Sequence, residues 1–354
     1  MAIKAASEYG FVNSRVRAIK SRFLTVGDYE RFLQSTSYEE FMKLLANTHY
    51  GPKVNKESPQ RIPAPDELAI ILSKDFAEVS YSIARSLTGR VREFTQAYTG
   101  MFLSESLKSI VRGLHVGLER DEILRFSVPT SPAQVDLFSQ LVDTGSVQKF
   151  VDAIPFSDIK VALLTRLPAF EDLGSTAPLE VALEEWFLRT VAKAVKGLSA
   201  DDRQRVIGFL ETRVILRNVL TMLRALVLKL GSRTIDLSLI RFTSKSKMLT
   251  ESIRIQPSWR EVLSQLEKTK YGQFAGRLAR LYEETQDLAD VEMAVEDYLA
   301  QQVRLLMSAF PFHSGTVLGF FTLKFYEIRN IRSIAVGIER GESADIIRRM
   351  ITIW

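Results

Sequence analysis

The side chains of this chain that could carry out chemistry are few, and they form no recognised catalytic motif. Its 354 residues contain no cysteine and three histidines, His49, His115 and His313. A zinc site of the Cys/His type is therefore excluded, and the zincin pattern His-Glu-x-x-His is absent. The glycine-rich loops that hold nucleotide phosphates are absent as well. We predict no catalytic residue, no metal, no cofactor and no direct binding of nucleotide.

Neighbouring carboxylates serve general acid–base chemistry only if both of them reach one site. Such pairs occur in the chain, for example Glu184-Glu185, Asp201-Asp202 and Glu283-Glu284. Adjacent residues on a helix point about 100° apart because the helix has about 3.6 residues per turn, so such carboxylates rarely face the same site. We therefore interpret these pairs as solvated helix surface, and the three histidines as structural side chains.

The arginines are the best candidates for a functional site because several of them recur. The dipeptide Arg-Asn occurs at Arg217-Asn218 and again, 112 residues later, at Arg329-Asn330. Planar guanidinium groups bind carboxylates well, and donors at symmetric positions would meet a polar partner around a shared axis. A role in solvated or inter-helix contacts is the alternative. The predicted docking residues are Arg15, Arg17, Arg217, Asn218, Arg329, Asn330 and Arg332.

The segments that carry these residues are predicted to be helices. Apolar residues recur three or four positions apart through most of the chain, which is the spacing of one face of a helix. The segment 216–230 shows this stripe most clearly, at Leu216, Val219, Leu220, Leu223, Leu226, Val227 and Leu230. Alternating strand patterns are scarce. The sequence therefore predicts an all-α fold.

Parts of the sequence repeat at nearly constant offsets. A pattern that begins with Ser-aromatic-x-Glu and ends with Thr-x-Tyr-Gly covers residues 37–51 and returns in residues 258–272, an offset of 221. Val-Gly-Leu-Glu-Arg at 116–120 returns as Val-Gly-Ile-Glu-Arg at 336–340, an offset of 220. The serine and the glutamate three residues later predict a capping box, in which the hydroxyl and the carboxylate each accept from a backbone N–H at the start of a helix.

These repeats divide the chain into three related helical units of about 112 residues each. The predicted units are residues 1–126, 127–241 and 242–354. The middle copy of the capping pattern begins at Ser146 and is the weakest, with Lys149 where the other two copies have glutamate. Three homologous units joined head to tail tend to close around a pseudo-threefold axis, as homotrimers do. We expect a funnel or ring whose hollow is a binding surface.

The overall composition is typical of a folded protein without a strongly basic surface. The net charge of +5 permits an anionic partner, but the sequence lacks the dense basic stripe of nucleic-acid binders, so we predict no binding of nucleic acid. A stretch of 19 uncharged residues between Arg304 and Lys324 approaches the length of a membrane span. Pro311 and Gly315 near its centre favour a buried helix–turn–helix instead. The first residues lack the apolar core of a secretory signal.

Three motifs of this chain resemble those of a known family. They are the segment from Tyr9 to Ala18, the turn Thr48-x-Tyr50-Gly51 and the segment from Leu323 to Arg332. Together with the length and the threefold repetition, they are similar to the C subunit of archaeal and bacterial A/V-type ATPases, whose counterpart in the eukaryotic vacuolar enzyme is the d subunit. The resemblance covers essentially the whole chain and favours the prokaryotic branch.

The resemblance implies a funnel of three helical domains on the cytoplasmic face of a membrane rotor, peripheral to the membrane. The implied partners are the central-shaft subunits, which dock into the funnel, and the proteolipid ring. Such a protein transmits torque in ATP-driven ion transport or ion-driven ATP synthesis and is not itself an enzyme. A slightly basic body would also be attracted weakly to an anionic bilayer surface. Two alternatives stay open at this point: a helical scaffold that binds an anionic protein or RNA, and a hydrolase with an unrecognised site.

Overall fold

The computed structural model describes residues 2–308 and 313–353, and within these ranges the regular structure is entirely helical, which confirms the all-α prediction. The long helices are α1 (Ala2–Lys20), α5 (Pro65–Arg85), α6 (Gly89–Val116), α10 (Ser157–Leu173), α11 (Ala177–Ala194), α12 (Ala200–Val227), α17 (Leu288–Ser308) and α18 (Ser314–Glu339). The shorter helices are α2 (Val26–Leu33), α3 (Tyr38–Ala46), α4 (Gly51–Glu57), α7 (Arg120–Leu124), α8 (Pro132–Val142), α9 (Val147–Ala153), η1 (Val195–Gly197), α13 (Ser232–Ser238), α14 (Ser244–Arg254), α15 (Trp259–Glu267), α16 (Gly272–Thr285) and α19 (Ala344–Arg348).

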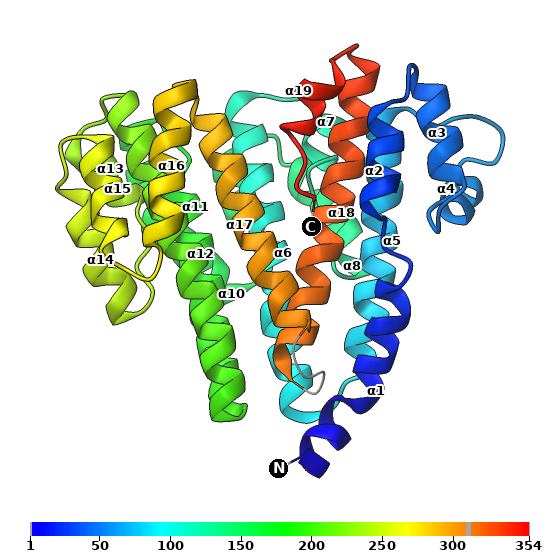
Figure 1. The fold of residues 1–354 in the computed structure, drawn as a ribbon, viewed down its shortest axis with the longest axis horizontal. Helices are drawn as coiled ribbons and strands as arrows, with labels where there is room; N and C mark the ends of the chain where they lie inside the picture. The colour runs from blue at the N-terminus through cyan, green and yellow to red at the C-terminus, as the bar shows by residue number, and fades with distance from the viewer. Residues whose placement is uncertain (1, 309–312, 354) are drawn as a thin grey trace.

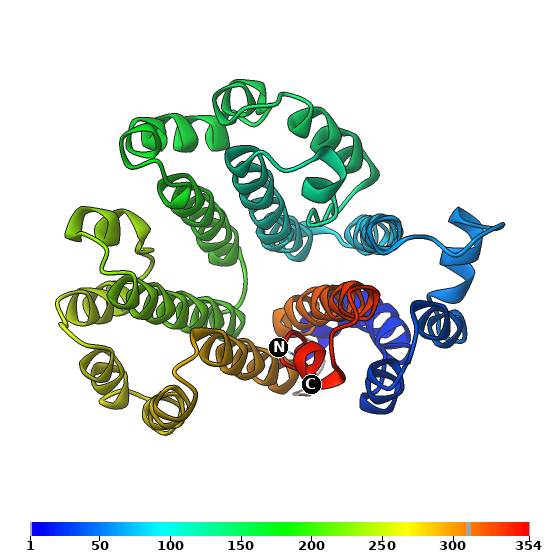
Figure 2. The same ribbon diagram turned by 90° about the horizontal axis from the view of Figure 1, so that it is seen from above.

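The body narrows from a wide end, where most of the short helices lie, to a narrow end where the long helices turn (Figure 1). Helices α6, α12 and α18 run in the same direction, with their N-terminal ends at the narrow end. Each packs against an antiparallel partner: α6 against α11, α12 against α17 and α18 against α5. Seen from above, the short helices lie mostly outside the long ones (Figure 2). This arrangement is compatible with the predicted funnel of three units.

The three parallel helices each bind the backbone of a segment that follows them. On α18, the amide of Asn330 accepts from the N–H of Thr352 (3.0 Å) and donates to the C=O of the same residue (2.6 Å). The equivalent bonds are Ser106–Val128, Asn218–Ile240 and Asn330–Thr352. We call these bonds the backbone clasps. Successive clasps lie 112 residues apart, which is the period of the sequence repeat.

The same period fixes the ends of these helices. A residue in the left-handed conformation follows each of them: Gly117 (φ 78°), Lys229 (φ 52°) and Gly341 (φ 71°). The sequence match at an offset of 220 aligns Gly117 with Gly337 and is therefore one helical turn out of the structural register. The structural counterpart of Gly337 is Gly113. A Cβ added to either would lie only 2.5 Å or 2.6 Å from an isoleucine side chain of the next short helix, α7 or α19, so a larger residue would force that isoleucine to move.

The helix starts predicted at Ser37 and Ser258 are confirmed. Their hydroxyls accept from the backbone N–H of Glu40 (3.2 Å) and Glu261 (3.3 Å), respectively. The second half of the predicted box differs. The carboxylate of Glu40 accepts from the N–H of Thr36 (2.8 Å), one residue before the cap, and that of Glu261 accepts from the Ser258 hydroxyl (2.7 Å). The serine hydroxyl therefore sets the start of each helix, and the carboxylate braces the cap in a different way in each copy.

The first part of the chain closes onto the last part. Helix α18 packs against α1, α3 and α5. The two carboxylate oxygens of Glu327 accept from the hydroxyl of Tyr50 and from the N–H of Leu24, both at 2.6 Å. Arg348 of α19 makes two 2.7 Å hydrogen bonds to Glu30 of α2. The domain boundaries after residues 126 and 241 stay a prediction, and this packing adds that the two ends of the chain share one body.

The uncharged stretch between Arg304 and Lys324 is explained largely by burial. Its described parts are the end of α17 and the start of α18, where Phe320 and Phe321 are fully buried in the core. The turn predicted at Pro311 lies outside the described residues. Among the residues that the structure describes, none of the helices combines the length and the apolar character that crossing a bilayer requires.

Candidate functional site

The two arginines predicted from the Arg-Asn repeat make the same ion pair. Arg217 of α12 lies 3.2 Å from Glu184 of α11, and Arg329 of α18 lies 3.2 Å from Glu296 of α17. Their side chains are 29% and 31% exposed. Each guanidinium therefore holds two long helices together and still has surface that a partner can reach.

The asparagines beside these arginines lie in the protein interior and do not reach the surface. Asn218 and Asn330 are fully buried, and their amides form two of the backbone clasps. Asn218 also donates to the hydroxyl of Thr250 (2.9 Å). Because neither amide reaches the surface, we keep the neighbouring arginines as the docking candidates.

On α6 the position equivalent to these arginines is Glu105, which belongs to a buried ionic cluster. Lys108 lies 2.9 Å and Arg213 lies 2.8 Å from the carboxylate of Glu105, and both cations also contact Glu184. Burial raises the pKa of Glu105, but Lys108 and Arg213 outweigh burial and bring the pKa to about 2. The same cations hold the pKa of Glu184 far below its usual range against the effect of burial. The cluster joins α6, α11 and α12 with its charges compensated.

The interpretation of the neighbouring carboxylates as solvated surface is wrong for Glu184 and Asp202. Glu184 is fully buried in the ionic cluster. Asp202 is buried and accepts from the hydroxyl of Tyr9 (3.1 Å) and the N–H of Ser314 (2.7 Å). Two adjacent side chains do point in different directions, but that leaves one of them free to face the core. The pair Glu283-Glu284 is exposed, as predicted.

The other predicted arginines are not brought together on one site. Arg15 of α1 donates to the C=O of Ser82 in α5 (3.4 Å) and to its hydroxyl, and Arg17 is exposed. Helix α1 lies toward the narrow end of the body (Figure 1). Arg329 and Arg332, in contrast, line one cavity beside α18. The seven predicted residues therefore fall into separate groups. Only Arg217 on α12 and Arg329 on α18 make contacts that repeat between equivalent helices.

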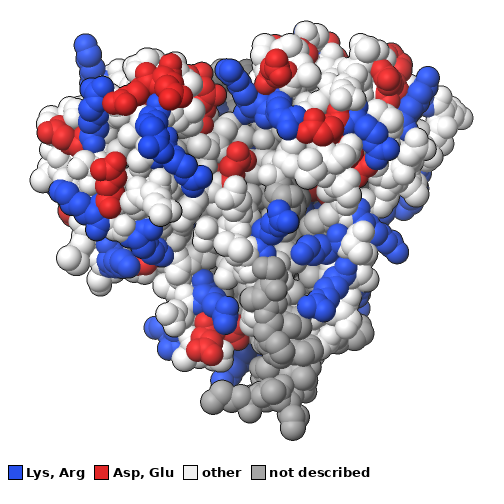
Figure 3. Space-filling model, in the orientation of Figure 1, with Lys and Arg blue, Asp and Glu red and all other residues white. Residues whose placement is uncertain are grey.

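Basic side chains do not gather into one dense patch on the face shown in Figure 3. Lys and Arg alternate there with Asp and Glu over the wide end of the body. Exposed ion pairs such as Arg120–Asp143 (2.8 Å) and Arg254–Asp236 (3.0 Å) compensate part of the charge. A mixed surface of this kind offers little of the continuous positive potential on which nucleic-acid binding depends.

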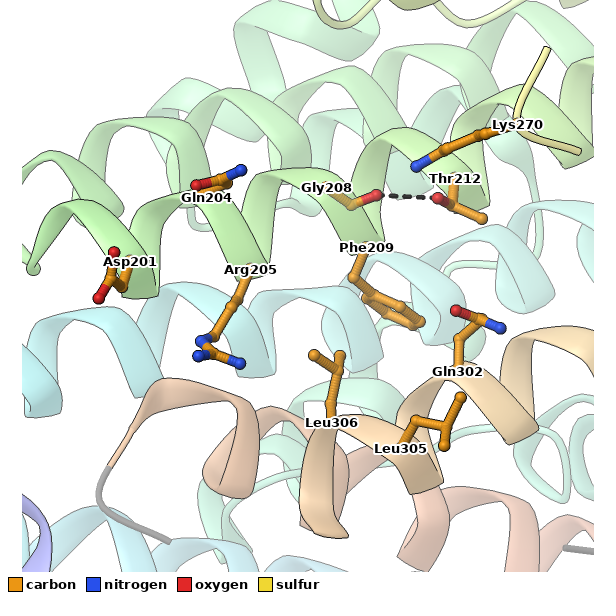
Figure 4. A pocket seen from close by; sticks show the side chains of 10 residues that line it. All are labelled: Asp201, Gln204, Arg205, Gly208, Phe209, Thr212, Lys270, Gln302, Leu305 and Leu306. Atoms are coloured by element: carbon orange, nitrogen blue, oxygen red, sulfur yellow. Dashed lines mark hydrogen bonds between the residues drawn. The ribbon is translucent and has the colours of Figure 1, made fainter. Parts of the chain in front are cut away.

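A groove of about 520 Å³ opens beside the N-terminal half of α12 (Figure 4). Helices α12 and α17 form its walls, and Lys270 reaches in from the connection between α15 and α16. Among the described residues its lining contains one carboxylate, Asp201, and no histidine. Within the described part of the chain, no group of His, Asp and Glu side chains is arranged to hold a metal ion.

The chain is similar over most of its length to proteins of archaeal ATP synthases. The C subunit of the A-type ATP synthase of Methanothermobacter thermautotrophicus is 26% identical over 333 residues, which cover 92% of this chain and 83% of the relative. That of Methanocaldococcus jannaschii is 22% identical over 349 residues, covering 97% and 86%, and that of Haloferax volcanii is 23% identical over 356 residues, covering 100% of both. A sequence model of the ATP synthase (C/AC39) subunit family matches residues 12–350. Because this match takes in nearly the whole chain, the protein belongs to the ATP synthase (C/AC39) subunit family.

Proposed function

We propose that this chain is the adaptor that connects the central shaft of a rotary A/V-type ATPase to the ring of membrane proteolipids. It transmits torque between them in ATP-driven ion transport or ion-driven ATP synthesis, and it catalyses no reaction itself. It lies on the cytoplasmic side of the membrane as a peripheral part of the complex. The three sequence units form the funnel that receives the shaft.

The observation that carries this proposal is the repeated framework of α6, α12 and α18. These helices run in one direction, each forms a backbone clasp, and α12 and α18 each make the same ion pair with the preceding helix. An adaptor that transmits torque must resist deformation, and helices packed at the density of a protein interior resist compression. The three archaeal relatives are covered over 83% of their length or more, which supports the same place in the complex.

The proposal is tested by binding to the shaft and ring of the same enzyme. We expect the chain to bind both, and the double variant Arg217→Ala/Arg329→Ala to bind the shaft roughly tenfold more weakly, as loss of an interface arginine typically causes. The variant should keep its helical circular dichroism because both side chains are about one-third exposed. Arg254→Ala, which removes a surface arginine of α14 that is 32% exposed, is the matched control.

The result that would overturn this function is a chain that binds neither shaft nor ring. Steeply salt-dependent retention on RNA would instead indicate that the chain is a scaffold that binds an anionic partner. Hydrolytic turnover by the pure chain would show that the chain is itself an enzyme. Unchanged shaft affinity of the double variant would reject the two arginines as docking residues and leave the adaptor role in place.

A further inference from the structure

A cavity of about 370 Å³ lies where α5, α6 and α18 meet, beside α7. Its position near the C-terminal end of α18 places it toward the wide end of the body (Figure 1). Four arginines line it, of which Arg340 is exposed, and apolar side chains lie near the other three: Arg125, Arg329, Arg332, Phe126, Val336 and Met350. The cavity combines cations with apolar walls and is separate from the groove beside α12.

Arg332 is the unusual cation of this cavity. Its guanidinium donates to the C=O of Ala69 (3.0 Å), to the C=O of Ser127 (3.4 Å) and to the hydroxyl of Ser73. Among the described residues, no carboxylate lies within 4.0 Å of it. Burial lowers the pKa of Arg332 to about 10, which still leaves the group charged at neutral pH. A cation held mainly by neutral acceptors has an uncompensated charge.

The arginines around the cavity also have unused donors. The Nε atoms of Arg125, Arg329 and Arg332 are buried and have no hydrogen-bond partner among the described residues. Arg125 and Arg329 have carboxylate partners at their other nitrogens, Asp66 at 3.0 Å and Glu296 at 3.2 Å. Leaving a buried donor unsatisfied is costly. An incoming anion would therefore gain most from Arg332, where both the charge and a donor are left over.

The apolar and acidic side chains that line the cavity determine which anion it can bind. Phe126 and Met350 are 52% and 47% exposed, and they offer apolar surface beside the half-buried cation. Asp66, Glu105 and Glu342 also line the cavity, and these carboxylates would repel a phosphate dianion more strongly than a single carboxylate. A carboxylate carried on an apolar peptide segment suits both the cation and the walls.

We propose that the cavity beside α18 binds an aspartate, glutamate or terminal carboxylate on an apolar segment of a partner protein, with Arg332 as its anchor. The identification of that partner as the central shaft rests on the proposed function. A guanidinium suits a carboxylate because the charge-assisted hydrogen bond between them is shorter and stronger than a neutral one. The apolar side chains of the same segment cover Phe126 and Met350.

The first experiment uses the chain alone, with 4-phenylbutyrate and inorganic phosphate as probes in titrations followed by NMR. We expect 4-phenylbutyrate to bind in the millimolar range, phosphate to bind more weakly, and Arg332→Gln to abolish the binding of 4-phenylbutyrate. Arg260→Gln, which removes an exposed arginine of α15 that is paired with Glu283, should leave it unchanged. No binding of 4-phenylbutyrate to the wild-type chain, or tighter binding of phosphate, would overturn the inference whatever the shaft does.

The second experiment measures the affinity of the chain for the shaft subunit. We expect Arg332→Gln to weaken binding about tenfold or more and Arg332→Lys to restore part of it, since lysine keeps the charge but loses the fork. Phe126→Glu tests the site without changing Arg332, because residue 126 is exposed, and should also weaken binding at least tenfold. Wild-type affinity in both Arg332→Gln and Phe126→Glu would reject the inference. Absence of shaft binding by a wild-type chain that binds 4-phenylbutyrate would reject the proposed function alone.

Discussion

The turns around Tyr50 and Tyr271 are two copies of one sequence, and they end in different surroundings. In both, the threonine hydroxyl accepts from the N–H of the tyrosine at 3.2 Å, and both tyrosine rings are buried. Tyr271 then shares a 2.9 Å hydrogen bond with the hydroxyl of Thr212 on α12. Tyr50 instead donates to Glu327 and accepts from Lys324 on α18, both at 2.6 Å. The local turn is the same in both copies, whereas the side chains that hydrogen-bond to the tyrosine hydroxyl differ.

The difference teaches which part of a repeat is free to diverge. Thr212 and Lys324 lie 112 residues apart, so they are equivalent positions on equivalent helices. A neutral hydroxyl serves in one copy, and a buried ion pair serves where the two ends of the chain meet. Lys324 and Glu327 are 1% and 0% exposed, so their charges depend on each other and on Tyr50. Removing one partner from the junction between the chain ends should therefore cost more stability than removing the neutral contact at Thr212.

The largest effect is expected from Glu327→Ala, which leaves the Lys324 ammonium without its nearest anion. Removing one member of a buried ion pair typically costs about 3–5 kcal/mol. We expect the free energy of unfolding, measured by urea denaturation, to fall by about this amount. Asp75 lies 3.5 Å from Lys324 and would retain part of the compensation. A loss below roughly 1 kcal/mol, the size of a single neutral hydrogen bond, would show that the ion pair does not hold the junction.

A smaller effect should separate the two tyrosines directly. Tyr50→Phe removes a hydroxyl that hydrogen-bonds two charged groups, for which the expected cost is about 2–3 kcal/mol. Tyr271→Phe removes a bond to a neutral hydroxyl and should cost about 1 kcal/mol. Both variants keep the ring and its packing, so each is the control for the other. Equal losses in urea denaturation would contradict the comparison.

The pH dependence of stability should report on His49 beside the same junction. Burial and the nearby Lys324 lower the pKa of His49 from 6.5 to about 4. Because the folded state then binds fewer protons than the unfolded state between these values, His49 destabilises the fold as the pH falls from about 7 toward 4. Burial raises the pKa of Glu327 and acts in the opposite sense, so the comparison must be between variants. His49→Gln should lose less stability than wild type between pH 7 and pH 5, by on the order of 1–2 kcal/mol. Parallel pH profiles would contradict this.

The smallest effect should come from converting one copy into the other. The double variant Lys324→Thr/Glu327→Ile places the α12 residues Thr212 and Ile215 at the equivalent positions of α18. Replacing a buried ion pair by neutral groups is often close to neutral, although the N–H of Leu24 loses its acceptor. We expect a net loss within about 1 kcal/mol of wild type, well below that of Glu327→Ala. A double variant as unstable as the single one would show that the charges themselves are required.

Features that depend on near neighbours in the sequence were predictable. The helix starts at Ser37 and Ser258 depend on bonds within three residues, and both are present. Even Ser146 caps its helix, at 3.4 Å from the N–H of Lys149, because the bond needs only the backbone of that residue. The recurrence of Arg217 and Arg329 pointed to equivalent positions, and their ion pairs with Glu184 and Glu296 are equivalent, whereas their role in docking stays a prediction.

Features that depend on distant residues were not predictable in this way. Glu184 is buried because Lys108 and Arg213, on two other helices, provide its counter-charges. Their separations of 76 and 29 residues leave no local signal beyond a lysine within an apolar helix. The contact of Tyr50 with Glu327 was hidden for the same reason, since 277 residues separate them. The amide roles of Asn218 and Asn330 were hidden too, because their partners are backbone groups that any residue provides.

The bond between Tyr50 and Glu327 has a consequence for the order in which a nascent chain folds. A ribosome adds about 5–20 residues per second, so the 277 residues between these partners take roughly 15–55 s to synthesise. Throughout that interval the binding place of Tyr50 on α18 does not exist. The buried core of residues 103–183 packs against apolar side chains no later in the chain than Trp186, so it can form in the meantime. During translation the middle core can therefore form before the segment around Tyr50 reaches its place on α18, and that early segment is the one that chaperones would need to shield.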